Sequence, residues 1–262
     1  ISGGQLGKQF HVSRTAVWKA INALKEEGYE IVSYKNSGYE LKQKGDVLDE
    51  GEIRRKVKAA KFGNVIHVLG SVPSTNRYIK EMNRDQLCHG LVVVAKQQTQ
   101  GRGKRGKAFP SPWKRGIYMS VYLQMKGELD EIHLLTMMAV LAICRALDKV
   151  CKIQPQIRYQ SDILLDGKKI GGILSELMLE AGVLTVEEAV LGIGLYVNEN
   201  ENAQEHPEGW TSIEAATGMH YDRNEIVAEI LNQLEICYTL YSKKEFRSLI
   251  NGYKKYWREV GQ

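Results

Sequence analysis

The chain of 262 residues has only four cysteines and five prolines, and it contains no apolar run of membrane-spanning length. The cysteines are Cys88, Cys144, Cys151 and Cys237, and no two of them form a C-x-x-C pair. This spacing argues against both a structural zinc site and a disulfide framework. No signal peptide is recognisable at the start. We therefore expect reduced thiols and a cytoplasmic protein that makes no use of a membrane.

Neither sign of charge dominates, because 36 Lys and Arg residues stand against 31 Asp and Glu residues, for a formal net charge of +5. Such an excess permits binding to a nucleic acid or a nucleotide without requiring it. The length exceeds that of one typical domain. We expect a small domain attached to a larger one.

The first expected domain, residues 1–45, begins with the spacing of a helix-turn-helix. A short helical pattern over 5–10 ends at His11, and Ser13 then provides an N-cap for a helix over 14–27. Gly28 follows the last apolar position and is typical of a helix end. The second helix is therefore expected to end at Glu27.

Two alternating segments, 29–34 and 39–42, flank the turn 35–38 and predict a β-hairpin wing. A winged helix-turn-helix with basic residues on its second helix is typical of a DNA-binding module. An alternative is a small helical interaction domain whose charges are merely solvated. The expected DNA contacts are Ser13, Arg14, Thr15, Lys19 and Lys35.

Residues 46–63 are charged and helix-prone, and we expect them to form a helical linker. From residue 64 to 262, strand patterns alternate with helix patterns and also cluster as hairpins. This mixture predicts an α+β domain around a mixed sheet. Strands are expected over 65–69, 91–95, 117–125 and 189–197, and helices over 76–83, 132–150 and 224–242.

A basic glycine loop, residues 101–107, follows the apolar run 91–95. Its three glycines allow close backbone approach, and its four cationic side chains favour an anion such as a phosphate. The spacing matches neither the P-loop nor the dinucleotide-binding pattern. A solvated basic surface loop is the alternative interpretation.

Other polar residues stand where a ligand could meet them. The run 74–76 brings Ser, Thr and Asn to the start of an expected helix, where backbone N–H groups favour an anionic or polar ligand. Gln98 precedes the glycine loop. Asp162 and Lys169 lie on the two arms of a hairpin that turns at 166–167. An ordinary surface ion pair is the alternative for these two residues.

Taken in order, these motifs resemble those of the biotin protein ligases. They are Ser74-Thr75-Asn76, then Gln98-Thr-x-Gly-Arg-Gly-x-Arg-Gly106, then Ser111-Pro112 and Tyr118-x-Ser120, then Asp162 with Lys169-x-x-Gly-Ile-Leu-x-Glu176, then Gly192-Ile-Gly-x-x-Val-Asn198. With the winged unit ahead of them, the chain resembles the bifunctional class that also represses the biotin operon. The resemblance implies a class II synthetase-like catalytic domain built on a mixed sheet.

The resemblance also implies a role for many residues. Biotin binding is implied for Ser74, Thr75, Asn76, Gln98, Gly101, Arg102 and Gly172. Adenylate binding is implied for Gly103, Lys104, Arg105, Gly106, Phe109, Arg158, Ser161 and Asn198. The implied catalytic residues are Lys169, Arg102 and Asp162. No residue is assigned as a metal ligand.

The implied reaction joins biotin and ATP, with Mg²⁺, into biotinyl-5′-AMP and releases pyrophosphate. Biotin then passes to a lysine of a biotin carboxyl carrier protein domain. The implied repressor binds operator DNA as a homodimer whose formation the ligand promotes.

Three departures from the family pattern concern the nucleotide. The usual Lys-Trp-x-Asn-Asp is here the run 158–162, Arg-Tyr-Gln-Ser-Asp; Lys104 replaces an arginine, and Tyr196 replaces an asparagine. These changes favour, as a second hypothesis, a biotin-sensing regulator with impaired or lost ligase activity. A lipoate-dependent acyl-lysine transferase is a third. Members also carry a small β-barrel, which we expect this chain to lack, and a first winged-domain helix, which we expect to precede Ile1.

Overall fold

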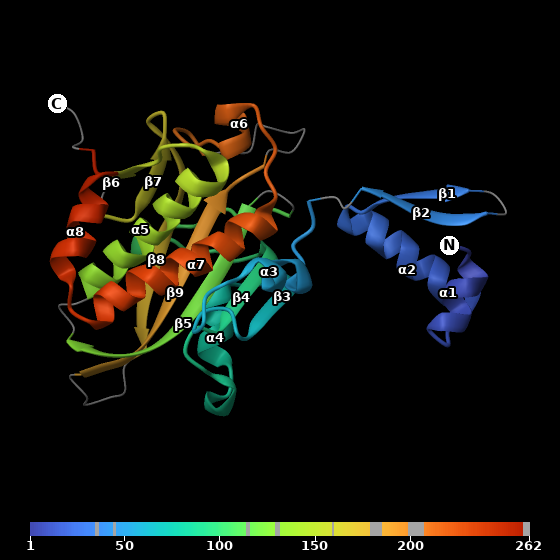
Figure 1. The fold of residues 1–262 in the computed structure, drawn as a ribbon, viewed down its shortest axis with the longest axis horizontal. Helices are drawn as coiled ribbons and strands as arrows, with labels where there is room; N and C mark the ends of the chain where they lie inside the picture. Colours follow the sequence, from blue (N-terminus) through green and yellow to red (C-terminus); the bar gives the residue numbers. More distant parts are fainter. Residues whose placement is uncertain are drawn as a thin grey trace. The chain divides into compact units, whose positions relative to one another are not determined.

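The computed structural model describes residues 1–34, 37–43, 46–113, 116–128, 132–158, 160–178, 185–198 and 207–258. The chain divides into two compact units, Ile1–Val47 and Leu48–Gln262. Figure 1 shows the elements of each unit, and the two are described separately.

The small unit contains α1 (Gly3–Gln9), α2 (Arg14–Glu27), β1 (Glu30–Tyr34) and β2 (Gly38–Gln43). The Ser13 side chain accepts a hydrogen bond from the backbone of Ala16, and Gly28 takes a left-handed conformation with φ 108°. These caps place the ends of α2 where the sequence predicts them. The two strands pair antiparallel, so the predicted helix-turn-helix and its wing are both confirmed.

Residues 48–63, which make up most of the segment expected to be a linker, belong to the larger unit. They contain α3 (Glu50–Lys56), whose Ile53 is fully buried, as is Phe62 beyond the helix. The backbone N–H of Asp49 donates to Asn224 Oδ1 at 2.9 Å, which fixes the start of α3. Because these apolar side chains enter the core, residues 48–63 form part of the larger fold and the linker expectation is corrected.

A seven-stranded mixed sheet organises the larger unit. Its strands are β3 (Ile66–Val72), β4 (Val92–Gln98), β5 (Gly116–Glu128), β6 (Gln156–Arg158), β7 (Asp162–Leu165), β8 (Lys168–Met178) and β9 (Thr185–Tyr196). Their order is β3-β4-β5-β9-β8-β7-β6. Only the β3–β4 pair among these described strands is parallel, and the other neighbours are antiparallel. The predicted mixed sheet is confirmed.

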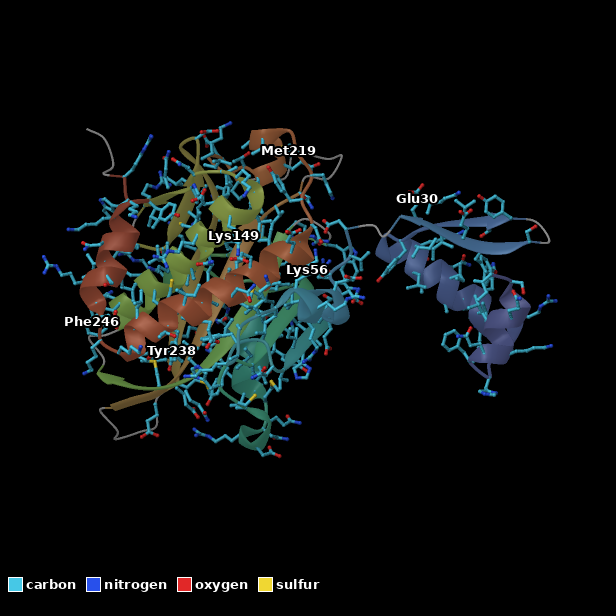
Figure 2. All side chains as sticks on the ribbon, in the orientation of Figure 1. Glu30, Lys56, Lys149, Met219, Tyr238 and Phe246 are labelled. Atoms are coloured by element: carbon cyan, nitrogen blue, oxygen red, sulfur yellow. The ribbon has the colours of Figure 1, made fainter. Side chains whose placement is uncertain are left out.

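Helices cover both faces of this sheet. Besides α3, the larger unit contains α4 (Thr75–Glu81), α5 (Ile132–Cys151), α6 (Ile213–Thr217), α7 (Arg223–Ser242) and α8 (Phe246–Lys254). The main core lies between the sheet and the long pair α5 and α7, whereas Ile79 of α4 packs with Val93 and Tyr122 in a second cluster. Lys149, labelled in Figure 2, joins α5 to α7 by donating to both carboxylate oxygens of Glu229 at 2.9 Å. Within the described residues, no helix has both the length and the apolar character needed to cross a membrane.

Candidate active site

A cavity of about 680 Å³ opens where the start of α4, the end of β4 and the β7–β8 hairpin meet β9. This volume is in the range of small-molecule sites. The predicted residues that line it are Ser74, Thr75, Asn76, Gln98, Arg102, Gly103, Lys104, Arg105, Phe109, Ser161, Asp162, Lys169 and Gly172. Segments about a hundred residues apart in the sequence therefore meet here.

Four predicted residues lie outside this lining: Gly101, Gly106, Arg158 and Asn198. A Cβ on Gly101 would lie 2.3 Å from the carbonyl oxygen of Phe109, so this glycine lets the two sides of the loop approach. Asn198 is buried and bonds both the N–H and the carbonyl of Tyr221, which gives it a structural position. Arg158 pairs opposite Asp162 at the end of β6.

The start of α4 forms the polar floor of the cavity. Gln98 accepts hydrogen bonds from the Thr75 N–H at 2.9 Å and from its hydroxyl at 3.2 Å. Ser120 Oγ of β5 lies 2.6 Å from Thr75 Oγ1 and 2.5 Å from Asn76 Oδ1, inside the protein. Each of these side chains is thereby held in one orientation, as a binding site for a polar ligand requires.

Glu176 of β8 extends this hydrogen-bond network, although it does not line the cavity. It accepts a hydrogen bond from Asn76 Nδ2 at 2.7 Å and one from Lys80 at 2.8 Å. Burial of Glu176 disfavours its charged form, but the hydrogen bonds from Lys80 and Asn76 outweigh this effect and lower the pKa of its carboxyl. An ionised Glu176 therefore orients the Asn76 amide.

Lys169 lines the cavity and forms an ion pair with Asp162. Its Nζ lies 2.7 Å from Asp162 Oδ1 and 4.5 Å from the centre of the Trp210 ring. Both side chains of the ion pair are largely buried, with exposed fractions of 18% for Lys169 and 22% for Asp162. This burial distinguishes the pair from the ordinary surface ion pair that the hairpin alone would suggest. A charge that is shielded from water acts more strongly on a bound anion.

The glycine loop extends beside this pair. The Gly103 N–H donates to the carbonyl of Lys107 at 2.7 Å, and Arg102 pairs with Ala108 across the loop. Partial desolvation, and then the neighbouring charges of Lys169 and Arg105, lower the pKa of Lys104 despite the opposing effect of Asp162. The loop thus concentrates positive charge at one end of the cavity.

Two aromatic side chains, Phe109 and Trp210, also line the cavity. Phe109 stacks on Tyr196 with ring centres 5.6 Å apart and meets Trp210 edge-on at 5.5 Å. The Phe109 ring lies over Gly194, where a Cβ would come within 2.4 Å of it. Rings in this position offer a flat apolar surface to a planar ligand such as a base.

Several lining residues were not predicted as site residues: Gln160, Ile173, Leu174, Gly192, Gly194 and Trp210. Trp210 reaches the cavity because its segment pairs with Lys169 in parallel. This long-range pairing leaves no local sequence signal. Gly192 and Gly194 do carry a signal, because two glycines interrupt an otherwise apolar strand.

On the small unit, Ser13, Arg14, Thr15 and Lys19 are all exposed at the start and along one side of α2. Lys35, the expected contact at the wing tip, lies outside the described residues. Exposed basic and hydroxyl groups at the start of a second helix fit the usual contact surface of a helix-turn-helix.

Comparisons with known proteins decide the family. The profile of the Biotin/lipoate A/B protein ligase family matches residues 68–195, and an HTH domain profile matches residues 1–40. The chain is 32% identical to the Bifunctional ligase/repressor BirA of Bacillus subtilis (strain 168), over 100% of its own length and 80% of the relative. The chain belongs to the biotin protein ligase family.

Further relatives agree with this assignment. The Bifunctional ligase/repressor BirA of Escherichia coli (strain K12) is 25% identical, over 97% of this chain and 77% of the relative. Among solved structures, a biotin protein ligase from Aquifex aeolicus in complex with biotin and ATP superposes with a TM-score of 0.62 at 25% identity. That match covers 76% of this chain and 81% of the other. The biotin ligase fold thus extends over about three-quarters of this chain.

Proposed function

We propose that the protein is a biotin–protein ligase that also acts as a biotin-responsive transcriptional repressor. The observation that carries the catalytic part is the shielded Lys169–Asp162 pair, which lies in one cavity with the polar network of Thr75, Asn76 and Gln98. The first feature suits an anionic reaction centre, and the second suits a polar heterocycle.

In the first step, a carboxylate oxygen of biotin attacks the α-phosphorus of ATP. A new P–O bond forms, pyrophosphate leaves, and biotinyl-5′-AMP remains. Lys169 and Arg102 neutralise the negative charge that grows on the phosphoryl oxygens, as cations do in other phosphoryl-group reactions. Asp162 orients the Lys169 ammonium through the bond at 2.7 Å.

Mg²⁺ enters this proposal as the ion that accompanies the ATP phosphates. Of the described residues that line the cavity, only Asp162 is acidic. No group of three or more His, Cys, Asp or Glu side chains able to hold a metal occurs in the described parts of the chain. Asp162 could therefore supply a carboxylate ligand, and the phosphates and water would supply the others.

In the second step, the amine of an acceptor lysine on a biotin carboxyl carrier protein domain attacks the acyl carbon of the adenylate. An amide bond forms, the bond from the acyl carbon to the phosphate oxygen breaks, and AMP leaves. The glycine loop shields the mixed anhydride from water between the two steps.

For repression, α2 contacts operator DNA through Arg14, Thr15 and Lys19. One winged unit contacts little DNA, so two copies reading paired half-sites are expected. We propose that the adenylate promotes this homodimer by ordering the glycine loop and the neighbouring sheet surface. Because the proposed partners are a carrier protein and operator DNA, we propose a cytoplasmic location for this function.

The deciding experiment incubates the protein with biotin, ATP and Mg²⁺ and measures biotinyl-AMP and pyrophosphate by mass spectrometry. Formation of both, followed by transfer to a carrier domain, supports the ligase. Binding of biotin without turnover, with biotin-dependent operator binding, would instead assign a regulator that has lost ligase activity. Adenylation of lipoate in place of biotin would overturn the substrate assignment.

A further inference from the structure

Tyr196 stands where the family pattern has an asparagine, and the structure gives this substitution a specific set of contacts. The residue lies near the end of β9 and is 1% exposed. Its hydroxyl donates a hydrogen bond of 2.5 Å to the carbonyl oxygen of Pro110, which follows the glycine loop. An asparagine side chain is too short to make the same bond from the same place.

The ring of Tyr196 adds a second connection to the same segment. It stacks on Phe109 at an interplanar angle of 20°, and its ring centre lies 5.5 Å from that of Trp210. Phe109 is in turn held over Gly194 of the same strand. Two consecutive residues after the loop, Phe109 and Pro110, are thus fixed to β9 by one tyrosine.

These two residues form the base of the glycine loop. The Phe109 N–H donates to the carbonyl of Gly101 at 2.9 Å, so the residue that Tyr196 holds also closes the loop. The basic side chains beyond this base, Arg102 to Lys107, remain exposed. Fixing the base therefore limits where the whole loop can lie, while its tip stays accessible.

We propose that Tyr196 is a positioning residue that fixes the base of the glycine loop against β9 before the nucleotide binds. This inference rests on the proposed ligase function. The cavity of about 680 Å³ is present while the Tyr196–Pro110 bond is made, so the fixed loop still leaves room for a ligand. A loop whose base is fixed in advance loses less conformational entropy when the ligand orders the rest of it.

The test compares Tyr196→Phe, which removes only the hydroxyl, with the matched control Tyr122→Phe. Tyr122 is also a fully buried tyrosine of this sheet, and its hydroxyl donates to Glu188 at 2.8 Å, away from the loop. The loop itself contains trypsin sites at Arg102, Lys104, Arg105 and Lys107. Limited trypsin digestion of the unliganded protein therefore reports loop opening directly.

We expect Tyr196→Phe to speed cleavage within residues 102–107 by about three- to tenfold, the range that loss of one hydrogen bond produces. Cleavage at Lys243 and Lys244, remote from the loop, should not change, and Tyr122→Phe should leave the loop rate unchanged. Equal loop cleavage in the wild type and Tyr196→Phe would overturn the proposal. A parallel rise at every site would overturn it too, since that result indicates general loosening.

Kinetics give a second measurement. Tyr196→Phe should raise the KM for ATP by about three- to tenfold, with kcat and biotin affinity within about twofold of the wild type. Tyr196→Asn, which also removes the ring, should raise it further. An unchanged KM for ATP in both variants contradicts the inference. If the wild type forms no biotinyl-AMP, the ligase function fails, whereas the trypsin comparison still decides the role of Tyr196.

Discussion

Lys169 faces Asp162 because the β7–β8 hairpin contains a β-bulge between these two residues. Ile163 pairs with Gly171, but the next residue, Leu164, pairs with Lys169, so Ile170 is extra. Without this bulge Lys169 would pair with Leu165, and its side chain would point to the opposite face of the sheet. The bulge therefore brings the Lys169 ammonium to 2.7 Å from the Asp162 carboxylate.

Lys169→Met should abolish most adenylate formation, because it removes the shielded charge opposite the phosphoryl oxygens. We expect a fall in kcat of at least about a hundredfold, the size seen when one electrostatic contact to a transition state is removed. Biotin affinity should stay within about threefold, measured by calorimetry. Lys168→Met is the matched control, since Lys168 is adjacent and exposed. Equal activity of the two variants would exclude the assigned role.

Gly192→Ala should weaken biotin binding by moving Asn76. A Cβ on Gly192 would lie 2.4 Å from Asn76 Oδ1, and the bonds of Asn76 to Glu176 and Ser120 prevent it from moving freely. We expect the Kd for biotin to rise at least about tenfold. The control is Gly70→Ala, because a Cβ there meets nothing nearer than 3.9 Å.

The outcome is decided by titration calorimetry with biotin alone, which does not depend on turnover. If Gly192→Ala binds biotin as tightly as Gly70→Ala, the polar floor around Asn76 is not the biotin site. A thermal melt of both variants shows whether a weaker Kd reflects local displacement or general unfolding.

Glu176 should give a defined pH dependence of stability. Its pKa in the folded protein is lowered, with burial opposing and the bonds from Lys80 and Asn76 prevailing. A lowered pKa means that the ionised carboxylate stabilises the folded state above its unfolded pKa of about 4.3, and that this contribution is lost as the pH falls below it. The stability difference between the wild type and Glu176→Gln should therefore be constant between about pH 6 and about pH 7, where the carboxyl group is ionised in both the folded and the unfolded state. The difference should shrink below about pH 4.

Urea unfolding at a series of pH values measures this difference. Glu81→Gln is the control, because Glu81 makes only an exposed ion pair with Arg77, and such pairs contribute little. Its difference from the wild type should be small at every pH. A Glu176→Gln difference that grows on acidification has the wrong sign and would contradict the assignment.

Local signals in the sequence predicted the elements that depend on local contacts. The Ser13 cap and Gly28 define both ends of α2, and the Asp166-Gly167 turn defines the hairpin that carries Lys169. The bulge at Ile170 and the approach of Trp210 to Lys169 depend on pairing between distant segments. Such pairing leaves no periodic signal in either segment.

The same reason explains why the surroundings of two further parts of the chain could not be predicted. Residues 48–63 have few apolar positions and resemble a linker, yet Ile53 and Phe62 are enough to bring them into the core. Asn198 belongs to a family motif, but its amide is used by Tyr221. Motif order identified the family, whereas the orientation of each side chain required the fold.

Arg14→Ala should weaken operator binding and reduce its salt dependence while leaving biotin binding unchanged. Arg14 is exposed in the first turn of α2, where its guanidinium lies beside Gly4 of α1. If it contacts one phosphate, its loss should reduce the slope of log K against log salt by about 1. The slope is measured by fluorescence anisotropy on labelled operator DNA, with biotin and ATP present at each salt concentration.

Lys243→Ala, which removes one exposed charge from the larger unit, should leave the slope unchanged. Equal slopes for Arg14→Ala and the wild type would remove Arg14 from the DNA-binding surface, and equal losses in both variants would mean that net charge, not the position on α2, determines affinity.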